Sequence, residues 1–429
     1  MPAPENRPVS RFRKKSTFYS LALASGIITS IYVVLDDFVN FKLITDPFVF
    51  GAFEMVVGFI VTFILVLFLH IPRKGKTRTG RKFNLGYKLD GNFQRLKLPR
   101  GKVAIYTLLA GLFATGSTIL YFYLLNRKGS SVIMPFSQFV LIYLLIGDAI
   151  SDREKPVIVE IQSIAMIAFG VIIASISSVG GNGSFTDFLI DVVLIMVPFS
   201  LFSAFYIYFQ KKALTTKNRE GKLYDSINLR IWTMLIITIG QTIAAAPALS
   251  NGGFVEVSNS WKIALFPVIV SMLLAFISIV FYTRALTMGK MSIVRALSSV
   301  SVVTTFPILG LASIWLPEIF GFGAENLMLD VVLKLSGSLL IIIGVIALAL
   351  SETKSILLVK AKQGFAINVE ELTKMKGIES VSFITGKYDL LINIKMRSIG
   401  KAFSLVEKSI AKLSWIDDVI TFQIMKEFE

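Results

Sequence analysis

Ionisable side chains inside apolar stretches are the residues of this sequence that could do chemistry. Glu54 lies about two turns inside the apolar run that begins at Pro47. At roughly 10 Å depth in hydrocarbon, an unpaired carboxylate would cost several kcal/mol or take up a proton. Glu54 is therefore a candidate proton-coupling site, or the partner of a buried arginine. The alternative is an interfacial position on a tilted helix.

Arg295 is the second ionisable candidate. It lies one turn inside the apolar run after Gly289, and Ser298 and further hydroxyl residues follow it in MSIVRALSSVSVVTTF, residues 291–306. Such a helix could line a hydrophilic cavity in which Arg295 binds a substrate carboxylate. The alternative is close packing of small residues around an arginine that snorkels to the interface. The other polar residues in these runs are Gln138, Gln210, Gln241 and Arg230, the last of which we expect at the interface.

The sequence argues against several classes of enzyme. Cysteine is absent, and the one histidine, His70, lies at the end of an apolar run. Disulfides, thiolate metal sites and thiol nucleophiles are therefore excluded, and histidine-based catalysis is not expected. There is also no phosphate-binding loop and no cluster of carboxylates. The sequence predicts a protein that is not an enzyme and that binds no metal and no cofactor.

The elements that must position these residues are membrane helices. The chain has 429 residues, of which 54% are hydrophobic, and its mean hydropathy is +0.71. About 20 apolar residues cross the hydrocarbon core of a bilayer, so the sequence predicts an all-α polytopic membrane protein. We expect ten transmembrane helices, at about residues 17–36, 47–70, 103–125, 130–149, 157–179, 187–210, 228–249, 261–284, 291–315 and 328–350.

Positive charge alternates between the connecting segments. The basic segments are 1–15, 72–101 and 211–222, and the segments almost without Lys or Arg are 180–186, 250–260 and 316–327. The positive-inside rule places the basic segments and both termini in the cytoplasm, beneath a cell membrane. The net charge of +16 is therefore read as contact with anionic lipid. Aromatic residues within 72–101 would also suit RNA or DNA, but the segment shows no binding motif, and we predict no nucleic-acid partner.

Two halves of the chain show related patterns. The same spacing separates Tyr32 from Tyr206 and Gly170 from Gly344, within similar local sequences. We therefore predict two five-helix repeats, 16–180 and 186–350. An odd number of spans in each repeat places the second one upside down, and such inverted repeats with a site near the midplane are typical of transporters.

This pattern resembles the EamA-type drug/metabolite transporter superfamily over residues 16–350. The resemblance rests on the span count, the halves, the turns before the fourth and ninth spans, and Gly-Val-Ile in the fifth and tenth. It implies a central cavity, and the residues that could face it by position are Tyr32, Tyr121, Gln138, Tyr206, Tyr282 and Arg295. Many members carry a glutamate late in the fourth and ninth spans, where the nearest carboxylates here are Asp148 or Glu154, and Glu318.

After residue 350 the composition changes to that of a soluble module. Strand patterns cover 355–362, 379–386, 388–396 and 417–426, and helix patterns cover 364–377 and 398–413. The order βαββαβ predicts a C-terminal α+β domain of ferredoxin-like fold over 355–429.

The module resembles the ligand-binding domain of the leucine-responsive/AsnC regulator family. The resemblance is carried by Val381, Thr385, Gly386, Tyr388 and Asp389, in that order and spacing. It implies pairing through the sheets and binding of small effectors by Gly386, Tyr388 and Asp389. The structural alternative is that Gly386 forms the turn and Asp389 binds backbone. The helix-turn-helix of such regulators is missing, which argues against DNA binding.

Together these observations predict a secondary transporter, specifically an exporter, of a small organic metabolite such as an amino acid. Its partners would be the lipid bilayer, the small-molecule substrate and a second copy bound through 355–429, with a C-terminal effector site as regulator. One alternative is a transporter whose C-terminal domain only dimerises it. Another is a membrane-bound metabolite receptor that transports nothing.

Overall fold

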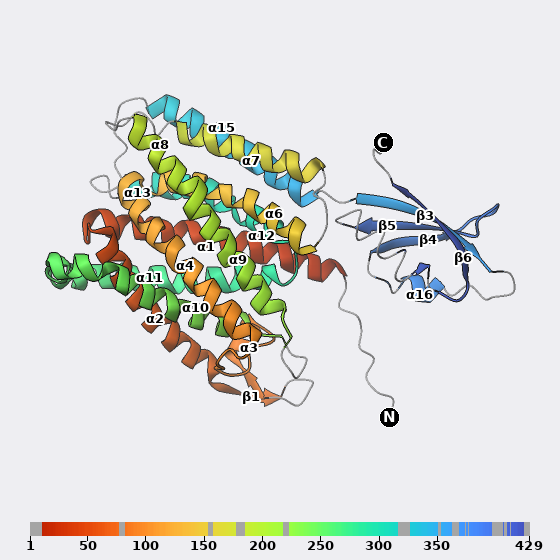
Figure 1. Ribbon diagram of the computed structural model, residues 1–429, viewed down its shortest axis with the longest axis horizontal. Coiled ribbons are helices and arrows are strands. Elements are labelled where there is room, and N and C mark those ends of the chain that lie inside the picture. The colour runs from red at the N-terminus through yellow and green to blue at the C-terminus, as the bar shows by residue number, and fades with distance from the viewer. Residues whose placement is uncertain are drawn as a thin grey trace. The chain divides into compact units, whose positions relative to one another are not determined.

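The computed structural model describes residues 11–76, 82–152, 158–176, 185–217, 223–315, 327–350, 353–362, 369–373, 375, 377–396, 406, 410–411 and 413–423. The chain divides into two compact units (Figure 1). Residues 1–147 and 164–345 form the first, which we call the helical unit. Residues 148–163 and 346–429 form the second, which we call the C-terminal unit.

Long helices dominate the structure. They are α1 (Arg11–Lys42), α2 (Pro47–His70), α3 (Leu85–Leu89), α4 (Lys102–Lys128), α5 (Ser130–Phe136), α6 (Val140–Asp152), α7 (Ile158–Ile176), α8 (Phe185–Leu194), α9 (Ser200–Thr215), α10 (Ser226–Ala248), α11 (Phe254–Leu286), α12 (Met291–Ser298), α13 (Val300–Trp315) and α15 (Leu327–Leu350). A 3₁₀ turn, Ser137–Phe139, joins α5 to α6, and a π-helical turn, Ile195–Phe199, joins α8 to α9.

Among the described residues, six helical stretches are long and apolar enough to cross a membrane: Thr17–Lys42, Pro47–His70, Lys102–Arg127, Ile190–Thr215, Ser226–Leu286 and Met291–Ala312. The fifth of these holds both α10 and α11, with Gly252 at a φ of +109° between them. Shorter apolar helices cover Ile133–Asp148, Ile161–Gly170 and Leu335–Ala347. Helices lie within each predicted span, while the count of ten membrane crossings and the inverted repeat stay predictions.

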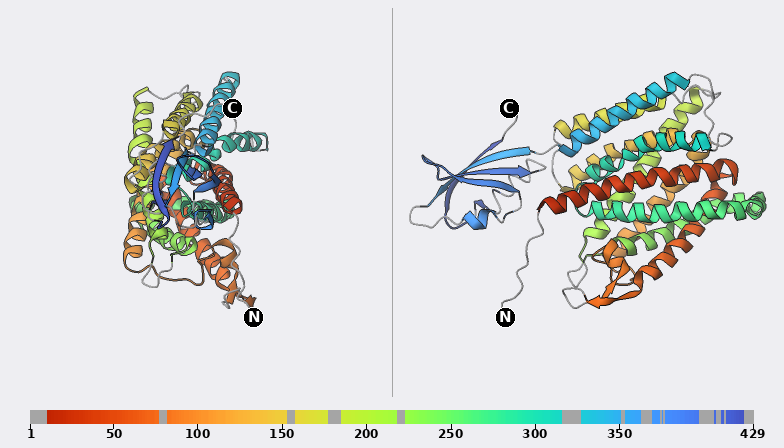
Figure 2. Two further views of the ribbon diagram at one scale, coloured as in Figure 1. Left: turned by 90° about the vertical axis from the view of Figure 1, so that its right-hand side faces the viewer. Right: turned by 180° about the vertical axis from the view of Figure 1, so that it is seen from behind.

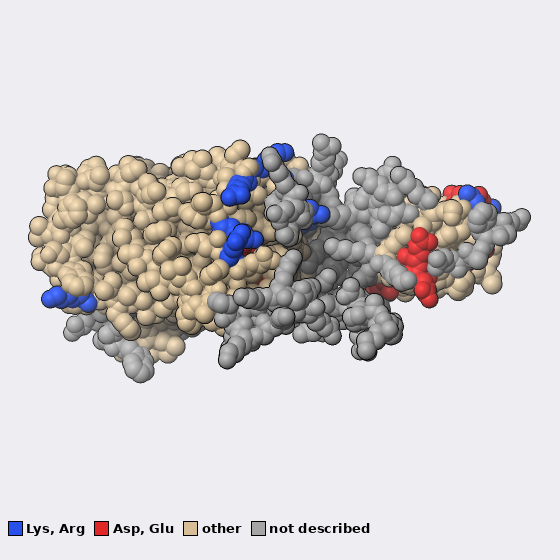
Figure 3. Space-filling model, turned by 90° about the horizontal axis from the view of Figure 1, so that it is seen from below, with Lys and Arg blue, Asp and Glu red and all other residues tan. Residues whose placement is uncertain are grey.

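The helical unit presents apolar side chains on its outer surface. Figure 3 shows one face of it as a broad surface with few Lys or Arg. Large aliphatic and aromatic side chains of the helical unit are exposed, including Ile243, Phe266 and Ile314. A surface of this kind would be unfavourable in water and suits the hydrocarbon of a bilayer.

Close helix packing holds the inside of the helical unit together. α1 packs along α11, α4 along α9, and α10 against both α2 and α4 (Figure 2). Gly26 of α1 contacts the backbone where α12 meets α13: a Cβ at this position would overlap the Ser298 carbonyl oxygen and the Val300 side chain. Small residues that let backbones approach are the common device of helix association in membranes.

The basic segment 72–101 is folded in its described part. β1 (Pro72–Lys76) pairs antiparallel with β2 (Lys82–Asn84), and α3 follows. Phe93 is fully buried in an apolar cluster with residues of α2, α10 and α11. Asn228 of α10 accepts from Lys97 N at 2.8 Å and donates to Arg95 O at 2.9 Å. This part of the segment therefore covers the first turn of α10.

Asp225 caps α10 and gives the helical unit a predicted pH dependence. Its carboxylate accepts from Asn228 N at 2.7 Å and from Asn228 Nδ2 at 2.8 Å. Burial raises the pKa of Asp225 from 3.8 to about 6, against the opposing effect of these hydrogen bonds. The folded state is therefore favoured by protonation. This contribution is complete below about pH 4 and is lost as the pH rises through about 6.

We expect Asp225→Asn to remove this dependence, because the amide keeps an acceptor oxygen for the cap and does not ionise. Relative to the wild type, the variant should gain up to about 3 kcal/mol of stability between about pH 4 and about pH 7. Thermal unfolding of both proteins in detergent across this range measures it. Loss of the Asn228 Nδ2 contact adds an offset that does not change with pH. A constant difference between the two proteins would contradict the prediction.

The C-terminal unit contains a four-stranded antiparallel sheet. Its strands are β3 (Thr353–Ala361), β4 (Ile378–Phe383), β5 (Leu390–Met396) and β6 (Ile416–Gln423), in the spatial order β4-β5-β3-β6. Helix α16 (Val369–Thr373) lies between β3 and β4 in the chain. Most of the second helix, predicted over 398–413, lies outside the described residues. The ferredoxin-like fold therefore stays a prediction.

Alternation along the strands creates two faces of this sheet. The register pairs Leu357 with Ile392 and Ile392 with Val381. These side chains belong to an apolar core that also holds Leu390, Ile394 and Trp415. Side chains at the intervening positions of the strands lie on the opposite face, which is the arrangement expected for a sheet covered on one side.

Candidate functional site

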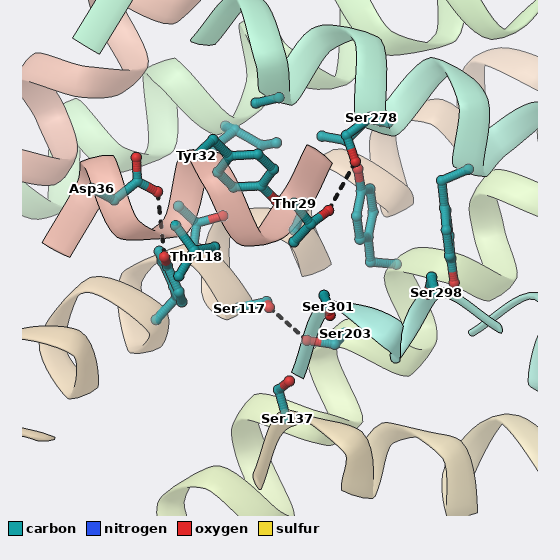
Figure 4. A pocket seen from close by; sticks show the side chains of 18 of the residues that line it. Thr29, Tyr32, Asp36, Ser117, Thr118, Ser137, Ser203, Ser278, Ser298 and Ser301 are labelled. Atoms are coloured by element: carbon teal, nitrogen blue, oxygen red, sulfur yellow. Dashed lines mark hydrogen bonds between the residues drawn. The ribbon is translucent and has the colours of Figure 1, made fainter. Parts of the chain in front are cut away.

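A cavity of about 260 Å³ lies among the helices of the helical unit. Its walls come from α1, α2, α4, α5, α9, α10, α11, α12 and α13. The 3₁₀ turn Ser137–Phe139 and the π-helical turn Ile195–Phe199 complete them. Sites for drug-sized ligands usually measure about 300–1,000 Å³, so this cavity fits a smaller solute. Figure 4 shows part of its polar lining.

One face of α1 supplies a polar row to the cavity. Ser25, Thr29, Tyr32 and Asp36 recur at helical spacing and all line it, because residues three and four apart share a face of a helix. Thr29 Oγ1 lies 2.9 Å from Ser278 Oγ of α11 (Figure 4). Hydroxyls and charges along this face make α1 the most polar wall among the described residues.

Hydroxyl groups bridge the other helices around the cavity. Ser117 Oγ of α4 lies 2.7 Å from Ser203 Oγ of α9 (Figure 4). Ser298 donates to Arg295 O at 2.9 Å. A hydroxyl can donate or accept by rotating, so these groups can bind either a hydrogen-bond donor or a hydrogen-bond acceptor of a solute.

Two arginines also line the cavity. Arg230 of α10 is only 5% exposed, and its Nε has no hydrogen-bond partner among the described residues. Arg295 of α12 donates from Nη2 to Ser137 Oγ at 3.3 Å, and its Nε likewise has no such partner. Both arginines interact electrostatically with Tyr32. Buried guanidinium groups without anionic partners are costly, and a carboxylate from a solute would supply the missing acceptor.

Two carboxyl groups, those of Asp36 and Glu54, line the same cavity. Asp36 accepts from Ser271 Oγ at 2.5 Å and from Tyr121 OH at 3.3 Å. Glu54 of α2 is fully buried. It lies within side-chain hydrogen-bonding reach of Asp36 and of Ser271, yet neither of its oxygens receives a hydrogen bond from a described residue. The cavity thus combines cationic and acidic groups.

The structure brings most of the predicted substrate residues together. Those that line this single cavity are Tyr32, Glu54, Tyr121, Tyr206, Tyr282, Arg295 and Ser298. Gln138 is buried beside it and donates to Met134 O at 3.1 Å, while its neighbours Met134 and Ser137 form the wall. Asp148 is buried outside the lining, and Glu154 and Glu318 lie outside the described residues.

Sequence reasoning placed one residue wrongly and missed another. Arg230 was expected at the membrane interface, but it lines the cavity, because the folded segment 82–101 covers the start of its helix. Asp36 was not singled out. Its position four residues after Tyr32, on the same face of α1, is the signal that could have found it.

The predicted effector residues occupy the β4–β5 hairpin of the C-terminal unit. Gly386 has a φ of +139°, a backbone conformation that residues other than glycine rarely adopt. Asp389 Oδ2 accepts from Ala361 N of β3 at 2.8 Å. Lys387 Nζ lies 5.9 Å from the centre of the half-buried Tyr388 ring. These contacts give Gly386 and Asp389 a structural role within the sheet.

Comparison with known proteins shows a similarity between part of the chain and a transporter family. Residues 16–176 match the EamA-like transporter family. No curated protein matches the chain. A solved structure titled "Crystal structure of protein" is 13% identical, with a TM-score of 0.45, and the match covers 74% of this chain and 98% of that one. That similarity is too low to assign a fold. The family match and the apolar helices together identify a multi-pass membrane protein that carries an EamA-like transporter family domain at residues 16–176.

Proposed function

We propose that the protein is a secondary transporter that exports a small organic metabolite carrying both a carboxylate and a cationic group, such as an amino acid. The EamA-like domain indicates a membrane transporter of small molecules. The observation that carries the finer proposal is the polar cavity inside the helical unit, in which Arg230, Arg295 and Asp36 all act electrostatically on Tyr32. Both termini would lie in the cytoplasm, in keeping with the basic segments.

The lining favours a solute with separated charges. Arg230 and Arg295 would bind its carboxylate, and the hydroxyls that line the cavity would complete its hydrogen bonds. An uncharged or purely cationic solute would leave both guanidinium groups unpaired in a buried site, which is unfavourable. An amino acid satisfies the cationic and the acidic groups at once.

Counterflow in proteoliposomes tests transport. Vesicles containing the purified protein are loaded with one unlabelled compound at a time, from a panel of amino acids and simple mono- and dicarboxylates, and entry of the same labelled compound is followed. A transporter accumulates label transiently, whereas protein-free vesicles do not. If no member of the panel, including simple mono- and dicarboxylates, gives counterflow, the receptor alternative replaces the transporter.

We further propose that the C-terminal unit pairs two copies of the chain. The sheet face opposite the core carries a row of apolar side chains, which we call the outer row: Ile356, Leu358, Leu391, Ile420 and Phe422. Ile420 and Phe422 are exposed. An exposed apolar face on a sheet is typical of an interaction surface, and the outer row of a second copy offers the same chemistry.

A charge within the outer row should break the pair. We expect Ile420→Glu to convert a dimer in detergent into a monomer, because a carboxylate buried in an apolar interface remains unpaired. Light scattering coupled to size-exclusion chromatography of the full chain measures the mass. Asp418→Glu, on the same strand and already charged, is the control. A monomeric wild type, or a dimeric Ile420→Glu protein, would contradict the prediction.

A further inference from the structure

The contact between Asp36 and Glu54 does not contribute to binding the carboxylate of a solute, because both side chains are acidic. The two carboxyl groups come from neighbouring elements, α1 and α2, and both line the cavity. Asp36 is 3% exposed and Glu54 is fully buried. They lie within side-chain hydrogen-bonding reach of one another.

The hydrogen bonds around Asp36 and Glu54 leave the contact between the two carboxyl groups without a donor from another described residue. Ser271 has a single hydroxyl proton, and it is donated to Asp36 Oδ1 at 2.5 Å. Tyr121 donates to Asp36 Oδ2. No described residue donates to either oxygen of Glu54. Since ionised carboxyl groups only accept, a hydrogen bond between Asp36 and Glu54 requires that one of them carries a proton.

The described residues that surround the pair do not supply a cation that could take the place of that proton. The groups that act on the pair are Asp37 on α1, Tyr121 on α4 and Ser271 on α11, together with Tyr32 on α1, which acts on Tyr121. Arg230 on α10 and Arg295 on α12 act on Tyr32. Among the described residues, no lysine or arginine forms an ion pair with Asp36 or Glu54. Two adjacent buried negative charges without a cation are strongly disfavoured.

We propose that the Asp36–Glu54 pair is a proton-binding site and that the proton is the coupling ion of transport. The inference rests on the proposed transport function. In the protonated state the two carboxyl groups share one hydrogen bond across the contact between α1 and α2. Release transfers the proton to water in the cavity and leaves two carboxylates that repel one another. Protonation thus changes the interaction between two helices that wall the solute cavity.

Infrared spectroscopy of the purified protein tests the site without any solute. A protonated carboxyl stretch should persist at neutral pH in the wild type, well above the range near pH 4 in which ordinary carboxyl groups titrate. Glu54→Gln should lose the hydrogen–deuterium-sensitive band, and Asp36→Asn should shift or remove it. Glu379→Gln, which changes an exposed carboxyl on β4, is the control and should keep it. An unchanged band in both cavity variants would overturn the proposal.

Gradient-driven uptake tests the coupling. Proteoliposomes are given a labelled mixture of the standard amino acids, with an imposed pH difference or an imposed sodium difference. The wild type should accumulate label against its gradient when the pH difference is present. Glu54→Gln should lose this accumulation at least tenfold, whereas Glu379→Gln, which changes an exposed carboxyl on β4, should keep it. Accumulation driven by sodium at equal pH, or undiminished pH-driven accumulation in the variant, would overturn the proposal.

The two measurements separate the two proposals. If the wild type transports no amino acid but its infrared band disappears in Glu54→Gln, the proton site stands and the proposed substrate class fails. If counterflow is normal and the band is absent, the transport function stands and the proton site fails.

Discussion

Arg230→Gln is expected to raise the KM of the transported solute by about 30-fold or more. The guanidinium of Arg230 is buried, its Nε has no partner among the described residues, and it lines the cavity beside Tyr32. Removing one member of a buried, hydrogen-bonded charge pair costs about 2–5 kcal/mol, and each 1.4 kcal/mol is about tenfold in affinity. Initial rates of counterflow over a range of solute concentrations measure the change.

Arg127→Gln is the matched control for this substitution. Arg127 lies at the end of α4, its side chain is 37% exposed, and it forms an ion pair with Asp191 at 3.6 Å outside the cavity. We expect its KM to stay within about twofold of the wild type. Arg230→Lys should fall between the two, since lysine keeps the charge but loses the forked geometry. Equal effects of Arg230→Gln and Arg127→Gln would show that Arg230 does not contact the solute.

Ile392→Ala is expected to unfold the C-terminal unit while the helical unit stays folded. Ile392 is fully buried between Leu357 and Val381 in the centre of the sheet. Truncation of a buried isoleucine to alanine costs about 2–5 kcal/mol. A module of this size has little stability beyond that. Limited proteolysis of the full chain should show rapid loss of the sheet residues from Thr353 onward, and the protected helical fragment should be unchanged.

Ile420→Ala is the matched control, because it makes the same change on the opposite face of the same sheet. Ile420 is 36% exposed, so less apolar contact is lost, and we expect less than about 1 kcal/mol in a single chain. At a protein concentration low enough for the chain to be monomeric, proteolysis of this variant should resemble that of the wild type. Equal sensitivity of the two variants would place the core of the unit elsewhere.

The sequence allowed much of the cavity to be predicted, because polar side chains in membrane helices face the protein interior or a water-filled cavity. Tyr32 and Tyr206 lie on separate helices, α1 and α9, and the matching spacing that linked them in the sequence corresponds to shared walls of one cavity. For Arg295 and Ser298 the sequence left a hydrophilic cavity and close packing both open, and both residues line this cavity. The strands of the C-terminal unit followed from their alternation, as with Leu390, Ile392 and Ile394.

Long-range burial could not be predicted in the same way. Arg230 lies in the first turns of α10, a position that is usually interfacial. It is buried because Lys97 and Phe93 belong to a segment folded onto the start of α10 and its neighbours: Trp232 Nε1 donates to Lys97 O at 2.8 Å. Nothing local in the sequence around Arg230 encodes that cover. The partnership of Asp36 with Glu54 likewise depends on how α1 and α2 meet, which no spacing within one helix determines.

The missing side chain at Gly26 limits how the chain can change over evolutionary time. α1 touches the Ser298 carbonyl there through backbone alone, and a carbonyl oxygen cannot rotate away as a side chain can. In a relative with alanine at this position, α1 must lie farther from the point where α12 meets α13. Such a shift would also move Tyr32 and Asp36, which lie further along the same helix. Variation at position 26 is therefore expected to arise only together with variation in the residues that line the cavity.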